Sequence, residues 1–338
     1  MRNSNKSKAE LLYNYPLYSI KRIPIFLKYA KQHSKLIAAE NKGNWCFIFI
    51  DIIWCNLRYG AMDSRDYWLF DFYSKSSFER NKYFTKRRYF KLIKQFDYEV
   101  FSFLLIKENV YKKYASFISR DWILVDRDTC TEDIITFIEK HGIVLVKPNS
   151  GEQGGGIFKA TKNNLSQIQN MLEHNKVLLE QVVTNCLEIS EINLSSLNTF
   201  RVYTMIDRCG ESHIIAIMLR AGVAGKTVDN WGSGGIGYHF DIESGVCVGY
   251  GYDKKHNRYI FHPGSRLKMV GFSIPRYREF KEFVFALTKI EPKARYVGWD
   301  IAITPDGFEL VEMNFPGGHD FLQAFGVPAY PFLIQKYW

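Results

Sequence analysis

Hydrophobic residues recur at helical spacing through the first third of the chain. Between residues 21 and 41, Ile23, Phe26, Leu27 and Ala30 follow a spacing of mostly three and four, with lysines between them, which predicts an amphipathic helix. Residues 80–100 repeat this pattern and predict a second helix. Its other face is crowded with cations that we expect to be exposed, namely Lys82, Lys86, Arg87, Arg88, Lys91 and Lys94.

The pattern changes near residue 132. Thr131 begins a predicted helix that ends at Gly142, and the apolar run 143–146 predicts a buried strand that leads into Lys147. Short strands and turns dominate from there on, with further helices predicted near 165–174 and 277–289. The sequence contains no internal repeat and no low-complexity linker. We therefore expect a gradual boundary near residue 105 between a helical N-terminal part and the rest of the chain.

A hairpin is predicted near the C-terminus. Pro305-Asp306-Gly307 separates two alternating runs and suits a three-residue loop. Thr304 then faces Phe308, Asp300 lies opposite Glu312, and Asn314 shares their face by the period of two. Like charges placed opposite each other on a sheet are destabilising. A shared Mg²⁺ held by these oxygen ligands removes the conflict, and loss of one charge is then expected to leave the metal-free fold equally stable or more so. A one-residue register error or a nearby cation is the alternative.

A glycine-rich segment follows Lys147. Four glycines occupy residues 151–156, which indicates backbone that approaches a ligand closely or takes positive φ. Exposed N–H groups in such a loop can hold phosphates, and Lys147 can pair with the same anion. The spacing matches neither the P-loop nor the dinucleotide-binding motif. A flexible hairpin turn remains the alternative reading.

Composition and charge narrow the possibilities. With 46% hydrophobic and 16% aromatic residues in 338, the chain has too much apolar surface for general disorder. The apolar run 45–57 is shorter than the roughly 20 residues of a membrane span, and no secretory signal follows Met1. The six cysteines lack zinc or redox spacing. We therefore expect free thiols and a cytoplasmic location.

The charge is unevenly distributed. Residues 1–120 carry 23 Lys and Arg against 10 Asp and Glu, a balance of +13, whereas residues 121–338 carry 22 against 25, a balance of −3. A basic front part favours an anionic partner such as an acidic glycan, a nucleotide sugar or a lipid. No nucleic-acid-binding motif accompanies the charge, so nucleic acid is not expected as a partner. An ordinary solvated basic surface is the alternative.

Taken in order, these motifs resemble the ATP-grasp superfamily, and more closely the sugar-transfer-associated ATP-grasp family of polysaccharide and capsule biosynthesis. The segments that carry the resemblance are residues 147–156, 197–202, 228–236 and 262–263, and the hairpin 298–314. The resemblance implies an α+β, ATP-grasp fold in which two subdomains clasp ATP. A helical region at 1–104 would precede an ATP-grasp domain at 105–338, with a nucleotide-clasping subdomain at about 105–190 and a metal and substrate subdomain at about 191–338.

The same resemblance implies residue roles. Lys147 would hold the α- and β-phosphates of ATP, and the glycines would cover the triphosphate: Gly154, Gly155 and Gly156. The backbone after Glu180, at Val182 and Val183, would contact adenine, and Glu188 would bind the ribose. Mg²⁺ would be held by Asp300, Glu312 and Asn314. Arg201 and Arg220 would stabilise the transferring phosphoryl group, and Asp229 or His319 would accept the proton of an amine. The first nucleotide lysine falls among Lys107, Lys112 and Lys113, and we favour Lys107.

The implied activity is an ATP- and Mg²⁺-dependent carboxylate–amine ligation through an acyl phosphate. The partners would be a small amine or amino acid and an acidic sugar or glycan precursor, and peripheral association with a membrane or a polysaccharide synthase stays open. A kinase or other phosphoryl transferase on a sugar, and a nucleotide-binding accessory module for polysaccharide enzymes, are the alternatives. Substrate identity and oligomeric state do not follow from the sequence.

Overall fold

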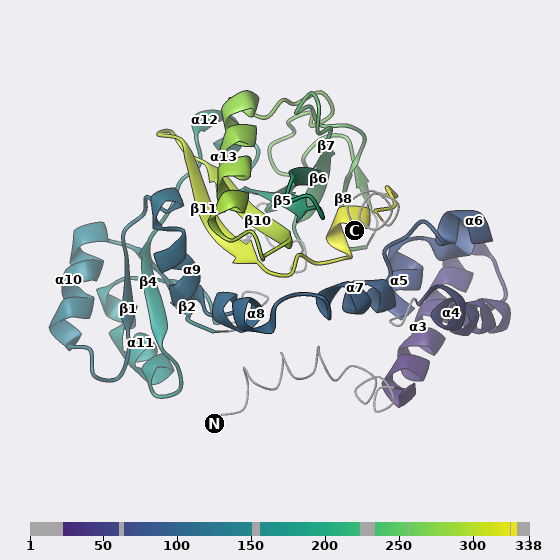
Figure 1. Ribbon diagram of the computed structural model, residues 1–338, viewed down its shortest axis with the longest axis horizontal. Coiled ribbons are helices and arrows are strands. Elements are labelled where there is room, and N and C mark those ends of the chain that lie inside the picture. Colours follow the sequence, from purple (N-terminus) through teal and green to yellow (C-terminus); the bar gives the residue numbers. More distant parts are fainter. Residues whose placement is uncertain are drawn as a thin grey trace.

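The computed structural model describes residues 23–60, 64–150, 156–223, 234–255, 257–324 and 326–329. These residues form helices and two antiparallel sheets, which confirms the predicted α+β class (Figure 1). The helices that precede the first strand are α3 (Ile23–Asn41), α4 (Trp45–Tyr59), α5 (Ser64–Leu69), α6 (Ser77–Arg80), α7 (Lys86–Ile93), α8 (Tyr98–Leu104) and α9 (Lys107–Lys113).

The single helix predicted for residues 80–100 is wrong. The segment forms the end of α6, all of α7 and the start of α8. Thr85 precedes α7 and uses its hydroxyl to donate to the carbonyl oxygen of Tyr59. The Asp97 carboxylate accepts from the N–H groups of Glu99 and Val100 and so begins α8 as a new helix. Hydrophobic spacing continues across both breaks, but the contact of Thr85 with α4 and the cap by Asp97 divide the segment into separate helices.

The expected face of six exposed cations is also only partly present. Lys91 and Lys94 are exposed, whereas the other four are half-buried. Arg87 donates to the carbonyl oxygens of Asn56 and Leu57 at the end of α4, which is a favourable place for a cation. Arg88 donates to the carbonyl oxygens at 81 and 83. Much of this basic stretch therefore holds the helices together.

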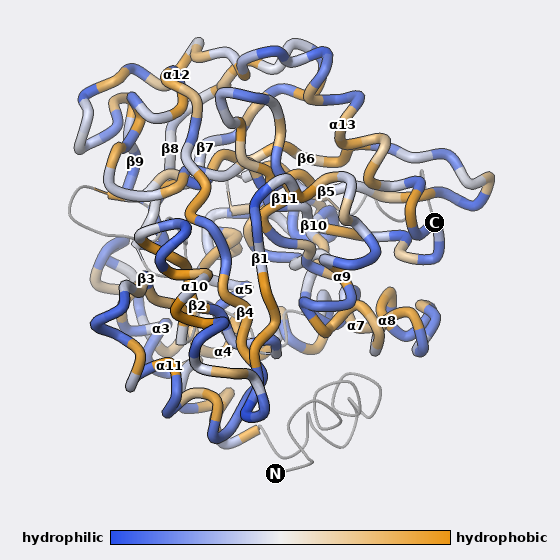
Figure 2. The backbone as a smooth tube through the Cα atoms, turned by 90° about the vertical axis from the view of Figure 1, so that its left-hand side faces the viewer, coloured by the Kyte–Doolittle hydropathy of each residue, from blue (hydrophilic) through white to orange (hydrophobic). Residues whose placement is uncertain are grey.

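The first sheet has four strands in the order β1-β4-β2-β3. Its strands are β1 (Trp122–Val125), β2 (Val144–Pro148), β3 (Phe158–Ala160) and β4 (Val177–Gln181). Two helices predicted from the sequence, α10 (Thr131–His141) and α11 (Leu165–Leu172), pack on it and share its separate hydrophobic core. Figure 2 shows hydrophobic residues along β1 and β4 and hydrophilic ones in the loops around them.

The second sheet has seven strands in the order β11-β10-β5-β6-β7-β8-β9. Its strands are β5 (Thr199–Ile206), β6 (Ser212–Ala221), β7 (Ile236–Phe240), β8 (Gly251–Tyr252), β9 (Arg258–Tyr259), β10 (Tyr296–Ile303) and β11 (Phe308–Asn314). The helices α12 (Leu187–Ser190) and α13 (Tyr277–Ile290) accompany it, the second as predicted.

The N-terminal helices and this second sheet share one hydrophobic core. Gln323, which is fully buried, joins them by hydrogen bonds to both backbone groups of Phe84. In Figure 1, α7 and α8 run along the lower side of the second sheet and connect α3–α6 to the first sheet. The N-terminal helices therefore pack against the second sheet, although the two regions are far apart in the sequence. Among the described residues, no helix is long and apolar enough to cross a membrane, and the six cysteines are free thiols.

Candidate active site

The β10–β11 hairpin places Asp300 opposite Glu312, as predicted, but through a different register. Near the turn Ile303, not Thr304, pairs with Phe308, so the predicted three-residue loop is wrong. Between Ile301 and Asp300 the register shifts by one residue of β11. Without that shift Asp300 would face Val311, and the Glu312 side chain would point to the opposite face of the sheet. The bulge at Val311 therefore brings the two carboxylates together.

Asp300 is only 2% exposed, and two arginines surround its carboxylate. Arg201, its partner on β5, makes a two-pronged contact with both oxygens, one of them at 2.8 Å, and Arg220 on β6 lies 2.7 Å from Oδ2. Burial alone would raise the pKa of the Asp300 carboxyl, but Arg201 and Arg220 outweigh it and hold the pKa below its usual value. Three adjacent strands thus present one carboxylate and two guanidinium groups on one face.

The hairpin has the donor set for Mg²⁺. Asp300, Glu312 and Asn314 supply oxygens from one face, and the amide Nδ2 of Asn314 is buried without a hydrogen-bond partner among the described residues. Because no hydrogen bond of Nδ2 fixes that amide, its Oδ1 is able to turn toward a cation. Within the described residues no three His, Cys, Asp or Glu side chains are grouped to hold a metal. Two carboxylates and one amide would leave a cation positions for phosphate and water, as Mg²⁺ prefers.

A second buried charge cluster lies on the first sheet. The Lys147 Nζ atom on β2 is 2.8 Å from Oε2 of Glu180 on β4, and the Tyr111 hydroxyl donates to Oε1 at 2.8 Å. Glu180 is 1% exposed, so it is not a surface acid. Burial raises the pKa of Glu180, but Lys147 and Arg120 outweigh this effect and lower it below its usual value. Lys147 is held charged at the end of β2, directly before the glycine-rich segment.

Arg120 connects this cluster to the hairpin. Its Nε atom lies 2.9 Å from Glu180, and its Nη1 atom lies 2.5 Å from Glu309 and 2.7 Å from the carbonyl oxygen of Leu310. Nη2 donates to the carbonyl oxygen of Val311 at 3.3 Å. Through the carbonyl oxygens of Leu310 and Val311, Arg120 therefore holds the bulge that aligns Glu312 with Asp300. The sequence reasoning missed Arg120, Tyr111 and Glu309. The sequence does contain one indication of this contact. Glu309 stands between apolar residues on a predicted strand, and an acid that is buried there needs a cation beside it.

The candidate first nucleotide lysines differ in their contacts. Lys112 pairs with Glu108 at 2.6 Å, and Lys113 pairs with Glu291 at 2.5 Å. Lys107 begins α9, and its backbone N–H donates to the carbonyl oxygen of Asn149, two residues after Lys147. The structure thus places Lys107 beside the end of β2.

The other predicted residues occupy varied positions. Gly156 has a φ of 79°, the left-handed conformation that glycine adopts without strain. Val182 and Val183 are half-buried directly after β4, and Glu188 is exposed in the first turn of α12. Gly154, Gly155 and Asp229 lie outside the described residues.

His319 is buried, 3.0 Å from the carboxylate of Asp66 and stacked on the ring of Tyr89, with 5.1 Å between the ring centres. Both partners come from the helical region. His319 thus connects the loop after β11 to α5 and α7.

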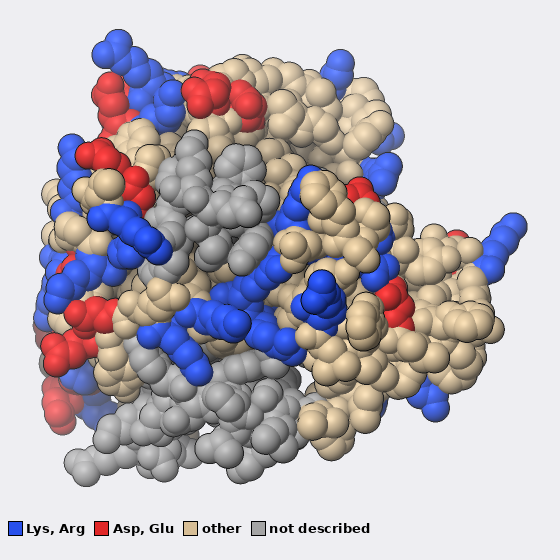
Figure 3. All heavy atoms as spheres, turned by 45° about the vertical axis from the view of Figure 1, so that its right-hand side comes forward, with Lys and Arg blue, Asp and Glu red and all other residues tan. Residues whose placement is uncertain are grey.

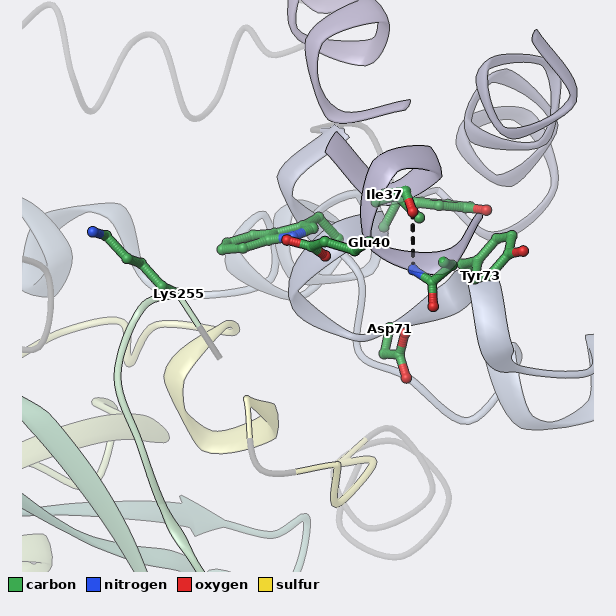
Figure 4. Close-up of a pocket in the computed structure, with 8 residues that line it drawn as sticks. Ile37, Glu40, Asp71, Tyr73 and Lys255 are labelled. Atoms are coloured by element: carbon green, nitrogen blue, oxygen red, sulfur yellow. Dashed lines mark hydrogen bonds between the residues drawn. The ribbon is translucent and has the colours of Figure 1, made fainter. Parts of the chain in front are cut away.

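Two cavities formed by described residues lie away from these charge clusters. A cavity of about 60 Å³ sits between α3, α5 and the loop after β8, from which Lys255 approaches (Figure 4). That volume suits one or two water molecules, and none of the residues discussed above lines it. A cavity of about 260 Å³ lies beside α10 and α11 and contains none of them either. The two buried charge clusters define the candidate site.

Comparison with known proteins defines the class. The family model described as sugar-transfer associated ATP-grasp matches residues 110–324, which is more than half of the chain. The chain belongs to this family, and the predicted family membership is confirmed. A search of curated proteins finds no match.

Several solved structures are similar in part. One is the ATP-grasp ligase PsnB, complexed with a phosphomimetic variant of a minimal precursor, Mg and ADP (13% identity, TM-score 0.41, 67% of this chain and 54% of that one). Others are D-alanyl-alanine synthetase A from Vibrio cholerae (14%, 0.43, 72% and 63%) and the VanG D-Ala:D-Ser ligase from Enterococcus faecalis (14%, 0.45, 70% and 62%). The chain spans between about half and two thirds of the length of each.

Proposed function

We propose that this protein is an ATP- and Mg²⁺-dependent carboxylate–amine ligase. Its substrates would be an amino acid or other amine and a sugar acid, and its products would enter a bacterial surface polysaccharide such as a capsule. Family membership supports ATP use. The observation that carries the proposal is the opposed pair Asp300 and Glu312, with Asn314 on the same face and Arg201 and Arg220 beside it.

The chemistry follows from these charges. A substrate carboxylate oxygen attacks the γ-phosphorus of ATP, which gives an acyl phosphate and releases ADP. The amine nitrogen then attacks the acyl carbon, an amide bond forms, and phosphate and a proton leave. Bound Mg²⁺ would neutralise phosphate charge. Phosphoryl transfer asks the protein mainly for positioning and charge compensation.

Several side chains have the charge for these tasks. Lys147, whose pKa stays raised despite burial because Glu180 lies beside it, would hold the nucleotide phosphates. Lys107, near the end of β2, would join it. Arg201 and Arg220 would face the transferring group. The roles assigned to Val182, Val183 and Glu188 in nucleotide binding, and to Asp229 or His319 as proton acceptor, remain predictions.

The direct test supplies ATP, Mg²⁺, uronic acids labelled with ¹⁸O in the carboxylate, and amino acids. A ligase that forms an acyl phosphate transfers one ¹⁸O atom to the released phosphate and forms an amide, detected by mass. Formation of a sugar phosphate, with the label retained in the sugar, would favour a kinase instead. Nucleotide binding without turnover of any substrate would favour an accessory module. The Glu312→Gln variant is the control, since it should lose the Mg²⁺-dependent reaction.

A further inference from the structure

Helix α4 exposes a continuous apolar stripe. Phe47, Ile50, Trp54 and Leu57 are 73%, 62%, 56% and 64% exposed. Their spacing of three, four and three places them on one side of the helix. The opposite side packs into the core through Ile48, Ile52, Cys55 and Tyr59. Four large apolar side chains on one helix face are far more than the scattered surface hydrophobics of an ordinary protein.

Cations border this stripe. Arg58 directly follows Leu57 on α4 and is exposed, and Lys42 is exposed in the turn between α3 and α4. Lys35 on the neighbouring α3 lies over the ring of Trp45 at 5.6 Å, on another side of α4. Over residues 23–59 there are five Lys and Arg against two Asp and Glu, a balance of +3. One of the acids, Asp51, is paired with Arg80 through both oxygens at 2.8 Å. In Figure 3 the part of the molecule on the right has a mostly uncharged surface, with Lys and Arg and a few Asp and Glu at its margins.

We propose that the outer face of α4 docks this protein onto a bilayer surface that contains anionic lipids. An interfacial helix combines an apolar face, which enters the boundary between headgroups and acyl chains, with flanking cations that attract anionic lipid. At 15 residues, α4 is about 22 Å long, too short to span the bilayer but long enough to lie in its surface.

Charge distinguishes a bilayer from a second copy of the chain. A symmetric dimer through this stripe would bring two surfaces of the same positive sign together, which is unfavourable. An anionic lipid surface is complementary to both the apolar stripe and the cations. The inference does not depend on the proposed ligase activity, because lipid binding is measured without substrate.

The test is co-sedimentation of the full chain with phosphatidylcholine vesicles and with equimolar phosphatidylcholine–phosphatidylglycerol vesicles. We expect binding to the anionic vesicles that weakens as salt rises. The double variant Phe47→Ser/Trp54→Ser should lower the partition coefficient roughly tenfold or more, because two large apolar groups no longer enter the lipid. Arg58→Gln and Lys42→Gln should each lower it by roughly fivefold at low salt.

The matched control is Leu187→Ser/Leu194→Ser, which removes side chains that are 74% and 86% exposed elsewhere on the chain and should leave binding unchanged. Melting temperatures check that every variant folds. If the double variant Phe47→Ser/Trp54→Ser does not fold, the single variant Leu57→Ser replaces it in the test. Absence of binding to either vesicle, or equal loss in the control, would overturn the proposal. So would a dimer in sedimentation velocity that only the α4 variant dissociates, since a second copy would then cover the stripe.

Discussion

Asp300 lies opposite Glu312, yet its charge is compensated by Arg201 and Arg220. This relationship changes what removal of each acid should do. From the sequence alone, the loss of either charge was expected to relieve repulsion. In the structure Asp300 is a buried partner of two cations, whereas Glu312 is half-buried.

Asp300→Asn should therefore destabilise the metal-free protein by about 3 kcal/mol, because two largely buried guanidinium groups lose their counter-charge. Chemical denaturation of variant and wild type measures the difference. Arg220→Gln in the same background should recover part of the loss, since it removes one of the uncompensated charges. A metal-free Asp300→Asn protein as stable as wild type would contradict the ion-pair assignment.

Glu312→Gln should leave the free energy of unfolding within about 0.5 kcal/mol of wild type, as expected for a change that breaks no buried pair. It should strongly reduce Mg²⁺-dependent ATP turnover, because one ligand charge is lost. Rates of ATP turnover at a series of Mg²⁺ concentrations measure this dependence. If turnover and its Mg²⁺ dependence match wild type, the hairpin does not hold the metal.

Lys147→Ala should weaken ATP binding about ten- to a hundredfold, since a charge-assisted phosphate contact contributes roughly 1.5–3 kcal/mol. Calorimetric titration with ATP gives the dissociation constant. Lys140→Ala is the control, because Lys140 pairs with Asp121 on the surface, and both its side chain and that of Asp121 are largely exposed. Equal affinities for wild type and Lys147→Ala would place the phosphates away from β2.

Arg120→Lys should loosen the hairpin bulge. Lysine keeps the charge but cannot reach Glu180, Glu309 and the Leu310 carbonyl with one planar group. Hydrogen exchange should increase at residues 310–312, and kcat should fall more than ATP affinity does. Arg120→Met should cost more stability, about 3–5 kcal/mol, by leaving two buried carboxylates short of a cation. Unchanged exchange in the Lys variant would show that the bulge is held by other contacts.

His262 should make stability fall in mild acid. It is fully buried and its Nε2 atom lies 2.8 Å from the Gly222 carbonyl oxygen; burial lowers its pKa below the usual 6.5, and the bond to Gly222 opposes this only in part. The unfolded chain therefore binds a proton that the folded chain does not. Stability from this group is complete above pH about 6.5 and declines as pH falls toward the folded pKa, by at most about 1.4 kcal/mol per unit.

Denaturation of His262→Gln as a function of pH checks this effect. The variant should be less stable at neutral pH but flatter between about pH 6.5 and 5. A wild-type slope equal to that of the variant would mean that His262 has the same pKa in the folded and the unfolded chain.

Local patterns sufficed for several features of the chain. Alternation with a turn at Pro305-Asp306-Gly307 predicted the hairpin, helical spacing predicted α3, and start and stop residues predicted α10, because these signals depend on neighbours within a few residues. Asp300 and Glu312 lie opposite each other as predicted only because two deviations cancel. The pairing at the turn is shifted by one residue, since Ile303 and not Thr304 faces Phe308, and the bulge at Val311 shifts it back. A count of residues detects neither one.

Contacts between distant segments were decided by the tertiary structure. Arg120 reaches Glu309 across 189 positions, and His319 reaches Asp66 across 253. Both pairings join elements that are distant in sequence and meet only in the packed fold. The compensation of Asp300 likewise depends on which strands become neighbours of β10. The sequence by itself determined the residue types, the family and the local elements. The docking of those elements decided which buried charges find partners, because a buried charge is stabilised by whatever lies within a few ångströms and not by its neighbours along the chain.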